Sequence, residues 1–291
     1  MKGKFIFGVL IFFAVVFIYI TFSYHVFSIK KTDNSATVLT AVATTTPDTK
    51  KIKILIVPGH EPGFGGAWYR GLKEEDLTLL LAKKIQGILK NDPRLDVIMS
   101  RDDGGWDYDI ANYIATNKTQ IENWVNEHKN KTQNTQMYDK QKLLHIPLTL
   151  YGTNKWADEN GIDIILNIHF NSNPKIIGQQ RYYKGFTIYT TSQKSSNSTS
   201  SKIFAKDIMN ELLKIENKSN APKEATGIVV DQDFIAIGSN NTLNAPSIIV
   251  EYAYIYENFM QATSTRNNFF DKAASSTATA INNYIENGLK K

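Results

Sequence analysis

The stretch that decides the fold is Ile162–Asn173, with the sequence IDIILNIHFNSN. Its first part, Asp163–Ile168, is a short apolar run rich in β-branched residues, which is typical of a strand buried on both faces of a sheet. His169 follows this run and precedes a cluster of Asn and Ser residues. Open α/β sheets bind their ligands beyond the carboxyl ends of the strands. The stretch therefore predicts a histidine that either points into a binding site or only hydrogen-bonds to a neighbouring loop.

Segments typical of strands and helices alternate on both sides of this stretch. Ile52–Val57 and Leu95–Met99 are strand-like, and Glu74–Leu89 between them has apolar residues on one helical face. Further strands are expected at Gly185–Thr190, Phe234–Gly238 and Ser247–Glu251, and further helices at Ile203–Ile215 and Ala262–Leu289. The repeated strand–helix order favours a parallel sheet with right-handed crossovers. We therefore predict an α/β domain.

The composition limits the kinds of site and partner. A chain of 291 residues can bury a substantial core. The formal net charge of +5 is mild, and no stripe of interleaved basic and aromatic residues predicts a nucleic-acid partner. An anionic partner such as a cell wall is compatible with this charge. Cysteine is absent, so any metal ion would be bound by histidine and carboxylate side chains.

The N-terminal part predicts a membrane anchor and a linker. Phe5–Phe22 is uncharged and has about the length that crosses a bilayer, roughly 20 residues. Lys2 and Lys4 precede it, and no small-residue cleavage site follows closely. We predict that residues 1–31 form a cytoplasmic tip and a transmembrane signal-anchor helix, with a cleaved signal peptide as the alternative. Residues 32–50 are expected to form a flexible linker, and residues 51–291 the folded domain.

Gly104–Glu159 is long for a connection between a helix and a strand. Tyr108–Lys129 within it has a helical pattern. The segment is either a helical insertion that packs over one edge of the sheet or a lid or groove wall beside a site. His128 lies in a polar context and is expected to be solvated, whereas His145 lies among apolar residues and is expected to be packed.

Chemically competent side chains end three of the expected strands. His60 follows the strand Ile52–Val57 in the motif Pro58-Gly59-His60. His169 follows the run Asp163–Ile168, and Glu251 ends the strand Ser247–Glu251. Two imidazoles and one carboxylate form the open ligand set of a catalytic zinc ion. A second carboxylate that is not a ligand can accept a proton from water and deliver it to a leaving nitrogen. The sequence therefore predicts a metal-dependent hydrolytic site at one edge of the sheet.

Three acidic residues, Glu74, Glu75 and Asp76, open the helix that follows the first strand. Acidic residues in a first turn often only complement the helix dipole. One of the three remains a candidate ligand. Glu251 is a separate candidate, because a carboxylate buried at the end of an apolar strand needs a cation, a donor or a metal-bound water nearby.

Several motifs occur in one order along roughly Ile52–Leu289. They are Pro58-Gly59-His60, the helix start from Glu74 to Ala82, Ser100-Arg101, Asn167–Asn171, Gly185-Phe186 and Pro246–Glu251. In this the chain resembles the zinc-dependent N-acetylmuramoyl-L-alanine amidases of bacterial cell-wall lysis. The resemblance implies a single three-layer α/β domain with a mostly parallel sheet of about six strands.

The resemblance also implies site residues and a substrate. Zinc would be held by His60, Glu74 and His169, and Glu251 would be the catalytic acid/base. The bond cleaved would be the amide between N-acetylmuramic acid and L-alanine in peptidoglycan. The domain would then lie on the extracytoplasmic side of the cell membrane, anchored by the N-terminal helix or, if the helix is cleaved, secreted.

The chain departs from the family pattern in places. Glu61-Pro62-Gly63-Phe64 replaces the family's Gly-Gly pair and the Asp that follows it after the first histidine. Glu257 stands where Asn is frequent, and Gly104–Glu159 is longer than usual. Some relatives keep a helix over the zinc until a partner removes it, so part of this insertion is a candidate gate and an activator protein a candidate partner. Two alternatives stay open: a zinc peptidase or deacetylase on the same scaffold, and a catalytically inactive, membrane-tethered wall-binding protein.

Overall fold

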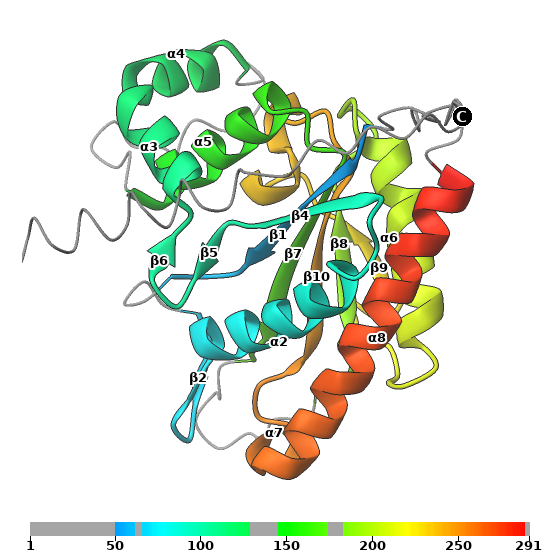
Figure 1. Ribbon diagram of the computed structural model, residues 1–291. Coiled ribbons are helices and arrows are strands. Elements are labelled where there is room, and N and C mark those ends of the chain that lie inside the picture. The colour runs from blue at the N-terminus through cyan, green and yellow to red at the C-terminus, as the bar shows by residue number, and fades with distance from the viewer. Residues whose placement is uncertain (1–49, 62–65, 129–144, 174–182, 289–291) are drawn as a thin grey trace, which may run out of the picture. The chain divides into compact units, whose positions relative to one another are not determined.

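The computed structural model describes residues 50–61, 66–128, 145–173 and 183–288 (Figure 1). In these ranges no helix combines the length and the apolar character needed to span a bilayer. The predicted transmembrane helix at Phe5–Phe22 and the predicted linker lie outside them. The side chains of His128 and His145 are also outside the described part, so what the sequence predicts for them stays a prediction.

A six-stranded sheet forms the centre of the domain, in the order β4-β1-β7-β10-β8-β9. The strands are β1 (Ile52–Pro58), β4 (Leu95–Met99), β7 (Ile164–Asn171), β8 (Thr187–Thr190), β9 (Ile228–Val230) and β10 (Ser247–Tyr254). Neighbouring strands are parallel except for β10 and β8, which are antiparallel. The predicted α/β fold with a mostly parallel, six-stranded sheet is therefore confirmed.

Alternate residues of the central strands are buried against helices on opposite faces of the sheet. Ile54 and Ile56 belong to the larger core, while Leu55 and Val57 belong to a second core with Ile110. The helices on the first face are α2 (Glu74–Leu89), α6 (Ser198–Leu212) and α8 (Thr263–Gly288). Burial on both faces explains why Ile54–Val57 of β1 and Ile164–Leu166 of β7 are continuous apolar runs.

The long segment after β4 is helical where the structure describes it. It contains α3 (Tyr108–Thr116), α4 (Lys118–His128) and α5 (His145–Glu159). The side chain of Asp107 caps α3 by accepting hydrogen bonds from the backbone N–H groups of Asp109 and Ile110. The single helix predicted at Tyr108–Lys129 is divided at Asn117, which ends α3. Helices α3 and α5 cover the second face of the sheet (Figure 1).

Short elements complete the domain. They are the hairpin β2 (Trp68–Tyr69) and β3 (Leu72–Lys73), the hairpin β5 (Arg101–Asp102) and β6 (Gly105–Trp106), the 3-10 helices η2 (Ile235–Ile237) and η3 (Ser239–Asn241), and α7 (Asn258–Gln261). The strand predicted at Phe234–Gly238 is wrong, because η2 occupies this segment. Gly238, with φ of 87°, ends η2 in the left-handed region that glycine adopts readily.

Candidate metal site and its pocket

The sheet topology brings the predicted site residues to one edge. β1, β7 and β10 are adjacent and parallel, with Pro58 opposite Ile168 and Glu251 opposite His169. The carboxyl ends of the three strands therefore lie at the same edge of the sheet. In one respect the sequence interpretation was wrong: Glu251 is not the last residue of its strand, since β10 continues to Tyr254.

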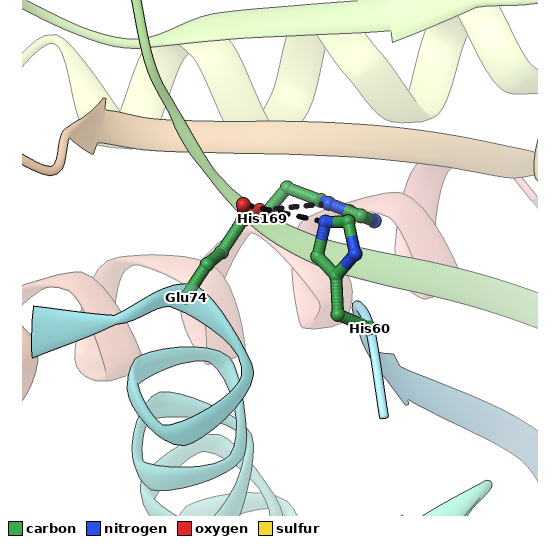
Figure 2. Close-up of side chains that lie close together, drawn as sticks. All are labelled: His60, Glu74 and His169. Atoms are coloured by element: carbon green, nitrogen blue, oxygen red, sulfur yellow. Dashed lines mark hydrogen bonds and ion pairs between the residues drawn. The ribbon is translucent and has the colours of Figure 1, made fainter. Parts of the chain in front are cut away.

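His60, Glu74 and His169 lie together at this edge (Figure 2). Each offers one ligand atom, and these three atoms all lie within 4.8 Å of one another. Nε2 of His60 is 3.3 Å from Oε2 of Glu74, and Nδ1 of His169 is 3.0 Å from Oε1 of Glu74. The centroids of the two imidazole rings are 5.0 Å apart, and the ring planes are nearly perpendicular, at 77°. The donor set and its spacing could hold a divalent metal ion.

Backbone groups orient the carboxylate of Glu74. The N–H of Ala67 donates to Oε2 at 2.6 Å, and the N–H of Phe170 donates to Oε1 at 3.0 Å. Burial alone would raise the pKa of Glu74, but hydrogen bonds from His169 and His60 and their charges hold it well below the ordinary value. Glu74 is therefore ionised across the physiological range. Glu75 forms an ion pair with Lys73 instead.

Small residues let the chain pass close to the ligands. A Cβ at Gly59 would overlap the imidazole ring of His169, so no larger residue fits at that position. Gly66 has φ of 86°, and a Cβ there would lie 2.8 Å from both Glu74 Cβ and His60 Cδ2. His60 itself has φ of 59°, a left-handed conformation that costs a non-glycine residue about 1–2 kcal/mol. Such strain is typical of functional sites.

Arg101 fastens the segments that carry two of the ligands. The side chain is buried, and its guanidinium donates to the carbonyl oxygens of Gly59 at 3.0 Å and Glu75 at 2.8 Å. It also donates to the carbonyl oxygen of Pro58 at 3.2 Å. One buried side chain thus joins the residues just before His60 to the first turn of α2. The Ser100-Arg101 motif pointed to this residue, but nothing in the sequence predicted which groups it binds.

Glu251 lines the same pocket as the three candidate ligands. Its Oε2 atom is buried and has no hydrogen-bond partner among the described residues. Burial raises the pKa of Glu251 well above its ordinary value, and the negative charges of Glu74 and Glu224 add to the effect. This carboxyl group therefore holds a proton more readily than an exposed glutamate does.

Glu224 is a polar residue near the site that the sequence interpretation missed, and its charge acts on Glu251. Its carboxylate accepts hydrogen bonds from five side chains, at 2.6 to 3.2 Å: Asn171, Thr187, Tyr189, Ser219 and Tyr254. Burial would raise the pKa of Glu224, but these hydrogen bonds hold it below the ordinary value. No pattern around Ala221–Ala225 distinguishes this glutamate from a surface residue.

A pocket of about 380 Å³ opens beside the candidate ligands. The lining also includes Trp106, Thr149 and Leu150 from the insertion, and Phe234, Ile235 and Ala236 from the segment around η2. The described residues of Gly104–Glu159 thus pack over the sheet and also contribute to the wall of the pocket. A gating motion stays a prediction.

Known proteins resemble the chain in sequence pattern and in fold. The family model described as N-acetylmuramoyl-L-alanine amidase matches residues 54–283. Among solved structures, Ami1 amidase from Mycobacterium smegmatis superposes with a TM-score of 0.57 at 14% identity, covering 82% of this chain and 98% of that one. A search of curated proteins finds no match.

Two further solved structures share the fold. The catalytic domain of the amidase CwlV from Bacillus (Paenibacillus) polymyxa has a TM-score of 0.52 at 17% identity, covering 81% of this chain and 98% of that chain. The CwlD amidase from Clostridioides difficile, solved in complex with the GerS lipoprotein, has a TM-score of 0.53 at 16% identity, covering 81% and 99%.

Proposed function

Because the chain belongs to the family of N-acetylmuramoyl-L-alanine amidases, we propose that His60, Glu74 and His169 hold the zinc ion with which it cleaves its substrate. The enzyme is an N-acetylmuramoyl-L-alanine amidase, and it hydrolyses the amide bond between N-acetylmuramic acid and L-alanine in peptidoglycan. The observation that carries the proposal is that three ligand atoms of the right types lie within 4.8 Å of one another. Two imidazole nitrogens and one carboxylate are a ligand set of catalytic zinc sites.

The surroundings of the three residues support a resident metal ion. Glu74 is buried and ionised, and two backbone N–H groups fix its carboxylate. Two half-buried histidines lie beside it, at 3.3 and 3.0 Å. Outer groups that orient metal ligands in this way typically contribute a factor of about 10–100 to metal affinity or activity. When bound, zinc lowers the pKa of a coordinated water to about 7 and polarises the carbonyl group under attack.

Glu251 is the proposed catalytic acid/base. It takes the proton from the attacking water and donates it to the nitrogen of L-alanine, so that the amine leaves in neutral form. Its position in the pocket, its buried oxygen without a hydrogen-bond partner and its raised pKa support this role. Efficient proton transfer needs a group whose pKa lies near the working pH, and burial moves Glu251 in that direction.

The cell-membrane location is also a proposal. Peptidoglycan lies outside the cytoplasmic membrane, and the uncharged Phe5–Phe22 segment after Lys2 and Lys4 would anchor the chain with the domain on that side. A regulatory partner is proposed by analogy, since one structure of similar fold contains a lipoprotein. Exposing membrane vesicles of known orientation to a protease would locate the domain; digestion from the cytoplasmic face would contradict the proposal.

Zinc content and product analysis together test the function. The purified chain should contain about one zinc per molecule, lose activity on sacculi after chelation and regain it when zinc is restored. Mass spectrometry of the products should show intact stem peptides with a free L-alanine amine. Cleavage within the stem would indicate a peptidase, loss of acetyl groups a deacetylase, and no product at all an inactive wall-binding protein. In the His169→Ala variant, we expect loss of zinc and of activity together.

A further inference from the structure

Besides the candidate ligands, several apolar residues from separate segments line the pocket. We use the name apolar wall for four of these residues: Trp106 of β6, Leu150 of α5, Ile235 of η2 and Phe234, which is the N-cap of η2. We propose that the apolar wall binds the sugar ring of the N-acetylmuramoyl group, so that the enzyme recognises the saccharide side of the scissile amide. The inference rests on the proposed function, because it takes the cleaved bond to lie at His60, Glu74 and His169.

The apolar wall is held in place by buried hydrogen bonds. Nδ2 of Asn154 on α5 donates to the carbonyl oxygen of Ile235 at 2.7 Å, and both groups are buried. This bond joins the insertion to η2. The indole N–H of Trp106 donates to the carboxylate of Glu61, the residue after His60. The wall therefore keeps a fixed distance from the metal side of the pocket, as a preformed binding site requires.

Phe234 is the most accessible aromatic residue of the apolar wall. Its side chain is 40% exposed, although it packs edge-to-face on Tyr189 with the ring centroids 5.1 Å apart. Replacing a partly exposed aromatic side chain by a smaller one costs the protein little stability. The exposed ring also offers an apolar face to a ligand. The C–H faces of a pyranose ring and the methyl of an N-acetyl group have the matching apolar character.

The charges of the pocket distinguish the sugar from the peptide. Its charged lining residues are Glu61, Glu74 and Glu251, and no lysine or arginine lines it in the ranges that the structure describes. Stem peptides carry carboxylate groups beyond L-alanine, and the described lining offers these groups no lysine or arginine to pair with. The muramoyl sugar is neutral and lies on the other side of the amide from the peptide. The apolar wall therefore fits the sugar, and the peptide points away from it.

A pair of soluble substrates tests the assignment. N-acetylmuramoyl-L-alanyl-D-isoglutamine contains the sugar, whereas D-lactoyl-L-alanyl-D-isoglutamine has the same scissile amide without it. We expect the full-length enzyme to hydrolyse the first with a kcat/KM at least about tenfold higher, a typical gain from a hydrophobic pocket. In Phe234→Ala and Leu150→Ala, this ratio should fall several-fold, mainly through a higher KM for the sugar substrate.

Leu213→Ala is the matched control, because Leu213 is 46% exposed at the end of α6 and does not line the pocket. It should keep the ratio of the unaltered enzyme. Equal kcat/KM for the two substrates, or an unchanged ratio in both wall variants, would overturn the inference while leaving the proposed function intact. Hydrolysis of neither substrate by the zinc-loaded enzyme would overturn the proposed function and the inference with it.

Discussion

The two sides of the pocket are built in different ways. On the metal side, His60, Glu74 and His169 lie at or near the ends of regular elements, and backbone N–H groups fix the carboxylate of Glu74 between the two histidines. The apolar wall comes from a two-residue strand, one helix of the insertion and a 3-10 helix. A catalytic constellation must be held to within about 0.5 Å, whereas an apolar contact tolerates more displacement. Substitutions on the metal side should therefore have larger effects than substitutions in the wall.

The largest effect is expected from Glu251→Gln. The amide keeps the size of the side chain but can no longer accept and donate the proton, so kcat should fall by roughly 10²–10⁴-fold. Zinc content should stay at the level of the unaltered enzyme, because Glu251 is not among the three clustered ligand atoms. Metal analysis and turnover of sacculi measure both quantities. Activity within about threefold of the unaltered enzyme would exclude an acid/base role for Glu251.

The metal side is also the part that the sequence predicts well. Continuous apolar runs identify β1 and β7, and a parallel order places their carboxyl ends at one edge, so His60 and His169 could be expected to meet. The contacts of Arg101 could not be predicted, because they depend on how the backbone of the first loop turns beside α2. Glu224 could not be predicted either, since its five donors come from four separate segments.

The apolar wall was less predictable for a physical reason. The continuous apolar run of Phe234–Gly238 is compatible with a short strand, but the chain there forms η2 against α5 instead. Tertiary packing overrides a weak local pattern in so short a segment. The insertion was recognisable by its length and helical pattern. Which of its residues face the pocket depends on how α5 is docked, and the sequence of the helix alone does not give that.

The next largest effect is expected from Arg101→Met, which keeps the apolar stem but removes the guanidinium. Three buried carbonyl oxygens would lose a donor, and the free energy of unfolding should fall by about 2–4 kcal/mol. Because the lost bonds connect the segments of His60 and Glu74, zinc affinity should also fall about 10–100-fold. Urea unfolding and competition with a zinc chelator give the two values.

Arg94→Met is the control for this variant, because Arg94 is an exposed arginine whose hydrogen bonds go to the nearby Asp92. It should change the unfolding free energy much less than Arg101→Met does and leave zinc affinity unchanged. If Arg101→Met weakens folding but not zinc binding, Arg101 supports the fold alone, and the metal side is less dependent on it than its contacts indicate.

A smaller effect concerns the pH dependence of the metal-free protein. The raised pKa of Glu251, caused first by burial, means that its stabilising contribution is present at low pH and is lost as the pH rises through that pKa. Glu74 has a lowered pKa and acts in the opposite direction, with its contribution lost only in acid. Glu251→Gln should therefore raise the unfolding free energy of the metal-free protein at neutral pH.

The expected gain is on the order of 1 kcal/mol, and it should disappear as the pH falls towards about 4, where the glutamate is protonated in both states. Urea titrations of the chelated proteins between these pH values measure it. An equal gain at both ends of the range would show that the substitution acts through packing, and a loss at neutral pH would show that Glu251 has a stabilising partner.

The smallest effect is expected from Trp106→Phe, at the link between the two sides. Phenylalanine keeps an aromatic ring in the apolar wall but removes the N–H group that donates a hydrogen bond to Glu61. The ring at position 106 would no longer be oriented by this bond, whereas the three candidate ligands would keep their positions. KM for the sugar substrate should therefore rise about threefold, while zinc content and kcat stay the same. Steady-state kinetics with metal analysis tests this. A loss of zinc instead would mean that Glu61 stabilises the loop of His60 through Trp106, and the two sides of the pocket would then have to be treated as one unit.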